Sequence, residues 1–71
     1  MSLTMGEKIR VLIRRKGVTI SELANMIDSS SQNLSNKLSR DNFSEKELQQ
    51  IARALGCSFQ GFFIDDQGDQ I

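Results

Sequence analysis

The chain contains no histidine, proline, tryptophan or tyrosine, and only one cysteine, Cys57. Without histidine it cannot form a zinc site that mixes Cys with His, nor a His-based catalytic triad. A single cysteine cannot form an internal disulfide, and it favours a reducing, cytoplasmic location. Because Cys57 follows a predicted helix end, we expect it to be a small buried hydrophobe, with a reactive thiol as the alternative.

Other absences narrow the function further. No apolar run approaches the length of a membrane span and no secretory signal pattern is present, so we expect no membrane partner. The sequence also lacks a glycine-rich phosphate loop, a metal-ligand cluster and an evident pair of catalytic carboxylates. We therefore expect no enzymatic activity, no catalytic residue, no metal or other cofactor, and no small-molecule ligand.

The length and the charge distribution fit one small domain. The chain has 71 residues, 38% of them hydrophobic and 25% charged, and from this length we expect no sensor or catalytic domain beside a binding domain. The formal net charge is zero, but residues 1–64 carry nine basic and six acidic residues, whereas residues 65–71 carry three acidic residues. We expect a mildly basic domain at residues 5–64 and an acidic flexible tail at 65–71. Residues 1–4 are expected to be an expression remnant or a frayed N-terminus.

Two helices are predicted in the first part of the chain. The first runs from about Thr4 to Lys16, and the second follows Thr19 and ends near Ile27. Each begins with a threonine that has Glu three residues later, which is the pattern of a capping box. Asp28 then stands where the chain must turn with a positive φ, which Asp tolerates.

Two further helices follow, and a fifth turn is expected after them. The third helix opens at Ser30 and ends near Ser39, and the fourth follows Ser44 and stops at Gly56. Apolar residues recur at helical spacing in all four. The inward stripes are Ile9, Leu12 and Ile13; Leu23, Ala24 and Ile27; Leu34 and Leu38; and Leu48, Ile51, Ala52 and Leu55. No β pattern or repeat is present, so we predict an all-α globule of five short helices.

The fifth predicted turn, capped by Ser58, carries three phenylalanines. Phe59, Phe62 and Phe63 fit core closure. A domain this small has difficulty covering three rings, so part of the cluster could instead form a dimer seam. Both interpretations remain open from the sequence.

The predicted helix from Ser30 to Ser39 has an unusual polar face. A solvated helix face is usually rich in Glu and Lys, but this one consists of Ser31, Gln32, Asn33, Asn36 and Lys37. Amide side chains both donate and accept hydrogen bonds, and Asn and Gln can bond an adenine edge in two places. The composition predicts contact with the major groove of DNA. The alternative is that these are ordinary exposed polar residues.

The ordered set of motifs resembles the Cro/C1-type, phage lambda-repressor-like helix-turn-helix family. The matching segments are Lys8-Ile9-Arg10-x-Leu12-Ile13, Thr19-x-x-Glu22-Leu23-Ala24, Ser30-x-x-x-Leu34-Ser35 and Leu48-x-x-Ile51-Ala52-x-Ala54-Leu55-Gly56. They cover about residues 5 to 64. The stretch from Gln32 to Leu38, followed by Arg40-Asp41-Asn42-Phe43, is also similar to small prophage-type regulators of Gram-positive bacteria.

The resemblance implies a five-helix, repressor-like regulator that binds double-stranded DNA, as a homodimer, with its third helix in the major groove. The base-reading positions fall on Ser31, Gln32 and Asn36, with Ser30 and Asn33 beside them. Phosphate contacts are expected from Thr19, Ser30, Lys37, Arg40 and Asn42, with solvated charges as the alternative for the two cations. The basic run Arg14-Arg15-Lys16 either stabilises its helix end or adds to the DNA-facing surface.

The chain departs from the family pattern at two places. Ile20 occupies the first position of the second helix, where the family often has a phosphate-binding Gln, and Asp28-Ser29 replaces the usual turn of Gly and an apolar residue. Both departures suggest modest affinity for a single half-site. The alternative function is a protein-interaction module that has kept the fold, such as an antitoxin or a phage-encoded antagonist.

Overall fold

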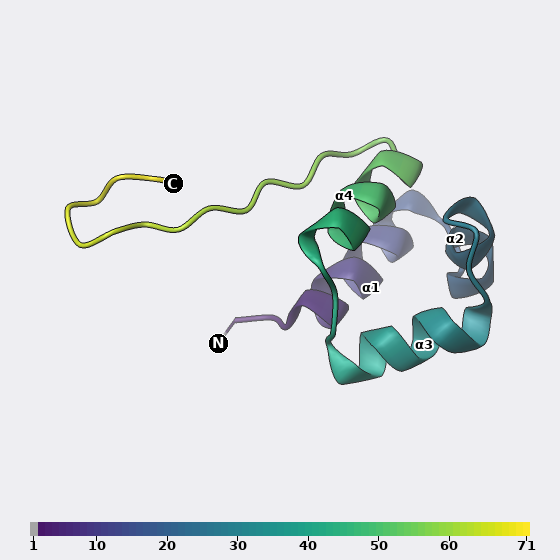
Figure 1. Ribbon diagram of the computed structural model, residues 1–71. Coiled ribbons are helices and arrows are strands. Elements are labelled where there is room, and N and C mark those ends of the chain that lie inside the picture. The colour runs from purple at the N-terminus through teal and green to yellow at the C-terminus, as the bar shows by residue number, and fades with distance from the viewer. Residues whose placement is uncertain (1) are drawn as a thin grey trace.

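The computed structural model describes residues 2–71, and this part of the chain contains four helices and no strand (Figure 1). The helices are α1 (Met5–Lys16), α2 (Ile20–Met26), α3 (Ser31–Arg40) and α4 (Glu45–Ala54). α3 packs against both α1 and α2, and α2 also contacts α4. The all-α class is therefore confirmed. No helix in residues 2–71 is both long enough and apolar enough to cross a bilayer.

Each helix begins at the hydroxyl cap that the sequence predicts. Thr4, Thr19, Ser30 and Ser44 each accept a hydrogen bond of 3.1 Å from the backbone N–H three residues later. In α1, α2 and α4 the third residue is Glu, and its carboxylate accepts in return from the backbone N–H of the cap. Because the two bonds of a capping box satisfy two otherwise unpaired donors, each helix start is fixed locally. Thr4 is thus part of the folded domain, while Met1 lies outside the described residues.

The turn between α2 and α3 takes the predicted backbone conformation. Asp28 has a φ of 57°, in the left-handed region that Asp tolerates better than most side chains. The next residue, Ser29, donates its N–H to the carbonyl of Ala24 over 2.8 Å. This bond closes α2 without the glycine that the family often uses.

The core lies where the four helices meet. Leu23 and Leu34 are its most buried large side chains, with 0% and 1% of their surface exposed. The cluster consists of Ile9, Ile13, Leu23, Ala24, Leu34, Leu38, Leu48, Ile51 and Leu55. Cys57 packs partly against this cluster, as expected for a small hydrophobe. The buried set matches the predicted stripes, except that Leu12 and Ile27 are only half-buried.

A close approach between α1 and α3 depends on Gly6. A Cβ atom at this position would lie 2.5 Å from the carbonyl oxygen of Leu38. The N–H of Gly6 donates to Asp41 Oδ1 over 2.6 Å, and Asp41 itself ends α3 with a φ of 57°. One carboxylate therefore accepts from the N-terminus of α1 while its backbone terminates α3.

The predicted fifth helical turn does not form, so the five-helix count is wrong for the described residues. After α4 the chain runs back along that helix in an extended conformation, and Gln49 Nε2 donates to the carbonyl of Phe59 over 3.1 Å. Phenylalanine and glycine are weak helix formers, and a helix of one turn does not repay its nucleation cost. Phe59 packs partly against the core, but Phe62 and Phe63 remain 50% and 81% exposed. Core closure is therefore confirmed for Phe59 and wrong for the other two rings.

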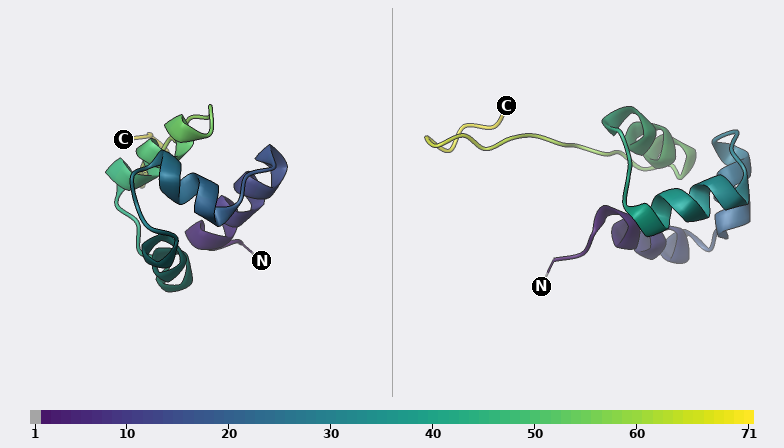
Figure 2. Two further views of the ribbon diagram at one scale, coloured as in Figure 1. Left: turned by 90° about the vertical axis from the view of Figure 1, so that its right-hand side faces the viewer. Right: turned by 60° about the horizontal axis from the view of Figure 1, so that its bottom comes forward.

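Residues 60–71 form an arm that projects from the helices (Figures 1 and 2). We call this segment the C-terminal arm. Its end folds back as a short hairpin, in which Phe63 and Ile71 exchange two backbone hydrogen bonds of 2.8 Å and Asp65 Oδ1 accepts from the N–H groups of Gln67 and Asp69. The radius of gyration is 13.3 Å, compared with about 11 Å for a compact chain of this length. The arm accounts for this excess.

Candidate nucleic-acid interface

α3 lies at one edge of the helical bundle (Figure 2), and the residues on its outward face are polar. Leu34 and Leu38 point into the core, and the side chains predicted to contact bases are exposed. These are Ser31, Gln32, Asn33 and Asn36. The structure thus brings all four onto a single helix that is free on its outer side, which is the arrangement a helix needs to enter a DNA groove.

Two side-chain hydrogen bonds organise this face. Gln32 Nε2 donates to Asn36 Oδ1 over 3.4 Å, one helical turn away. The hydroxyl of Ser31 is 2.8 Å from that of Ser21, which joins α3 to α2. An amide group has two donors and an accepting oxygen, so Gln32 keeps its oxygen and one N–H free. This is the donor and acceptor pair that the N6 and N7 atoms of adenine require.

The predicted phosphate-contacting residues on α3 are not equivalent. Arg40 and Asn42 are exposed at its C-terminal end, where they line a shallow depression with Asn33, Asn36 and Lys37. Lys37, however, forms an ion pair with Glu47 of α4. Nothing in the sequence indicates this pair, because the approach of two helix ends cannot be derived from local spacing. A phosphate at Lys37 must therefore compete with Glu47.

A second basic locus surrounds the start of α2. Arg10 and Arg14 of α1 line a depression together with Thr19 and Ile20. Arg14 therefore lies beside Thr19, a predicted phosphate contact, and also in the last turn of its own helix. Arg10 was missed in the sequence, although its spacing of one helical turn from Arg14 was a usable signal. Two arginines here could supply the phosphate contact that Ile20 cannot.

The two predicted capping residues in the interface are already engaged. The Thr19 hydroxyl accepts from the N–H of Glu22, and the Ser30 hydroxyl accepts from that of Asn33. The backbone N–H of Thr19 donates to the Glu22 carboxylate over 3.0 Å, and this bond, followed by the nearby Thr19 hydroxyl, lowers the pKa of the Glu22 carboxyl. Both hydroxyls therefore organise their helix starts first, and their expected phosphate contacts stand as proposals.

The three phenylalanines of the predicted dimer seam lie away from α3. Phe59, Phe62 and Phe63 line a hollow with Leu48 of α4 and with Ile71 of the arm. Among residues 2–71 no cluster of three or more His, Cys, Asp or Glu side chains could hold a metal ion. The chain thus has two separate exposed surfaces, one polar on α3 and one apolar at the arm.

Comparison with known families agrees with this arrangement. A family model for the Cro/C1-type HTH DNA-binding domain matches residues 8–67. No curated protein and no solved structure matches the chain. The family match spans most of α1, all of α2, α3 and α4, and the first part of the arm. The chain therefore belongs to the family of Cro/C1-type helix-turn-helix DNA-binding domains.

Proposed function

We propose that the protein is a sequence-specific transcriptional regulator of the repressor type, which inserts α3 into the major groove of double-stranded DNA. The observation that carries this proposal is the exposed amide and hydroxyl face of α3 on a DNA-binding domain. Solvated helices rarely combine these side chains, whereas base edges require donors and acceptors of this kind.

The residues divide into two roles. Ser31, Gln32, Asn33 and Asn36 contact base edges, and Gln32 reads an adenine through its two free amide atoms. The positioning contacts to phosphates come from Thr19, Ser30, Lys37, Arg40 and Asn42. Arg10 and Arg14 add to this set because they flank the start of α2.

The proposed active form is a homodimer on a two-fold-symmetric site. The basic excess of residues 1–64 is only three charges, so one subunit gains little from phosphate neutralisation. Two subunits would place two copies of α3 roughly 34 Å apart, one turn of DNA. The seam is formed by Phe62 and Phe63, which the protomer leaves exposed, next to Phe59.

Selection from random duplexes followed by gel shift tests the proposal. We expect an enriched site with two-fold symmetry, binding that weakens with salt, and loss of base preference when Gln32 and Asn36 are replaced by alanine. An unchanged preference in Gln32→Ala and Asn36→Ala would show that α3 does not read bases through these side chains.

The acidic arm supports a second candidate, a protein-interaction module on the same fold. Asp65, Asp66 and Asp69 cancel the positive charge of the rest of the chain. Salt-dependent binding separates the two functions, because a DNA reader gains affinity as salt falls. Absence of binding to any duplex at low salt would favour the interaction module.

A further inference from the structure

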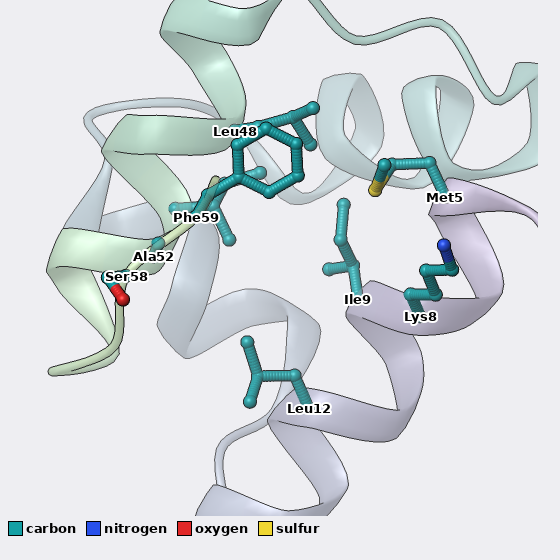
Figure 3. A pocket seen from close by; sticks show the side chains of 9 residues that line it. Met5, Lys8, Ile9, Leu12, Leu48, Ala52, Ser58 and Phe59 are labelled. Carbon is teal, nitrogen blue, oxygen red and sulfur yellow. The ribbon is translucent and has the colours of Figure 1, made fainter. Parts of the chain in front are cut away.

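An apolar groove lies between α1 and α4, and residues 2–71 leave it open to solvent (Figure 3). Its walls are Met5, Ile9 and Leu12 on one side and Leu48, Ala52 and Phe59 on the other. The space measures about 150 Å³. An apolar cavity of about 150 Å³ holds one benzene ring, so the groove is the right size for a single phenyl group.

The arm of the same protomer is directed away from this groove. The bond from Gln49 to the carbonyl of Phe59 fixes the chain against α4. At Gly61 a Cβ would approach the Phe59 ring to 3.2 Å, so the chain passes tightly over that ring. From there the arm runs beyond α4 (Figure 1), and the Phe63 side chain in the arm is 81% exposed.

We propose that the groove is filled by the Phe63 ring from the arm of a second copy of this chain, and that the exchange is reciprocal. This deepens the homodimer of the proposed function and rests on it. A two-fold interface needs one patch that is complementary to itself, and this chain carries both halves, an uncovered ring and an uncovered groove. Phe63 is the fifth residue after Ser58, and five extended residues span about 17 Å, which is enough to carry the ring beyond its own helices to a neighbouring subunit.

The charges agree with a second copy as the occupant. Side chains two residues apart lie on the same side of an extended chain, so Asp65 accompanies Phe63. The arm carries three Asp and no basic residue. The groove is lined by the exposed Lys8 of α1, and Arg15 lies on the same face of the helix two turns later. An acidic arm with an aromatic ring thus meets an apolar groove with a basic rim.

An isotope-filtered nuclear Overhauser experiment on a mixture of carbon-13-labelled and unlabelled full-length chains tests the exchange directly. We expect transfer from aromatic ring protons of the unlabelled copy to the methyl groups of Ile9 and Leu12 in the labelled copy. Phe63→Leu should remove that signal and identify the ring. Transfer to these methyls only within one chain, or a monomeric protein at the same concentration, would overturn the proposal.

Sedimentation equilibrium measures the dimer dissociation constant of matched variants. Phe63→Ser should raise the dimer dissociation constant at least tenfold, while Gln60→Ser, an exposed polar site in the same arm, should leave it unchanged. Lys8→Glu should weaken the dimer and Lys46→Glu, the same charge change on α4, should not. Equal constants for Phe63→Ser and the parent chain would contradict the exchange.

DNA binding measured on the same samples separates this inference from the proposed function. A dimer that depends on Phe63 but binds no duplex would leave the arm exchange standing and refute the DNA reader. If instead the parent chain binds a selected duplex and Phe63→Ser dimerises as strongly as the parent, the DNA reader stands and the arm exchange is refuted.

Discussion

Gln32 is the side chain on α3 whose replacement should change sequence preference most. Its free amide oxygen and N–H can bond both N7 and N6 of one adenine, a pair that contributes about 1–3 kcal/mol of discrimination. Gln32→Ala should therefore discriminate less between duplexes of different sequence. The loss of discrimination should be confined to one base-pair position in each half-site. Competition gel shifts against singly substituted sites measure this.

Asn25→Ala is the matched control, since Asn25 is an exposed amide on α2 outside the proposed contact set. It should retain both affinity and preference. Relaxed preference in both variants would mean that the effect comes from the fold of the helix pair and not from a base contact.

The ion pair between Lys37 and Glu47 predicts unequal contributions from two cations of α3. Arg40→Ala should reduce the magnitude of the salt-dependence slope by about 0.9 per subunit, the value for one lost phosphate contact. Lys37→Ala should reduce it less, because its ammonium group is shared with a carboxylate. Titrations of affinity against salt concentration give both slopes.

Glu47→Gln should act in the opposite direction and raise DNA affinity, with a steeper slope. Glutamine keeps the second half of the capping box, so α4 retains its start while Lys37 is released. A slope that does not change in Glu47→Gln would show that Lys37 is not available to phosphate in the complex.

The contact between the start of α1 and the end of α3 makes Gly6 indispensable for the packing of these helices. Gly to Ala in an exposed helix is stabilising by about 1 kcal/mol, but here the new methyl group would meet the Leu38 carbonyl. Gly6→Ala should instead destabilise the domain by about 1–3 kcal/mol, as overpacking does. Urea unfolding followed by circular dichroism measures the change.

Ser39→Ala, at an exposed site on α3 near the same contact, should stay within about 0.5 kcal/mol of the parent chain. If Gly6→Ala proved more stable than the parent, α1 and α3 could not approach as closely as described.

The capping box at the start of α2 should make part of the stability of the folded state depend on pH. The folded-state pKa of Glu22 is lowered by hydrogen bonds from Thr19, so the ionised carboxylate stabilises the folded state at neutral pH. That contribution is complete above the pKa of the unfolded chain and is lost as the pH falls through the folded-state pKa. Glu22→Gln should flatten the fall of Tm below about pH 5.

Asp66→Asn, which removes an exposed carboxylate from the arm, is the control and should leave the acid limb of the Tm curve unchanged. An equal flattening in both variants would indicate a general charge effect instead of the capping bond.

Local signals explain which parts of the fold could be predicted. The four helices and their starts follow from caps and apolar spacing within about seven residues, so Thr4, Thr19, Ser30 and Ser44 were all identified. The fifth turn was expected at Ser58, but Gly61 and its aromatic neighbours do not sustain a helix. The expected flexibility of residues 65–71 stays a prediction, although the structure records a hydrogen-bonded turn there.

Contacts between helices explain what could not be predicted in the site. The face of α3 was evident because its residues share one helix. The pairing of Lys37 with Glu47, the position of Arg10 beside Thr19 and the carboxylate of Asp41 at Gly6 all join separate helices. Such contacts depend on how the helices cross, which no local pattern encodes.

The protomer combines the polar face of α3 with an arm, on a separate surface, that carries exposed aromatic rings and three Asp residues. The net charge of zero arises because the acidic arm balances the basic domain, and we therefore expect affinity for DNA to depend on joining two subunits. Arm exchange would hold the acidic residues at α1 of the partner, next to Lys8. Dimerisation and DNA binding should therefore be coupled, with the arm variants losing affinity for two-fold sites and retaining preference at single half-sites.

Base reading by α3 through Gln32 is tested most directly by measuring how this side chain couples to adenine N7. Adenine in the selected site would be replaced, one position at a time, by 7-deazaadenine, which lacks the N7 acceptor. At one position per half-site we expect a loss of about 1–3 kcal/mol for the parent chain and almost none for Gln32→Ala. An equal loss in both proteins at every position would show that Gln32 does not bind an adenine N7.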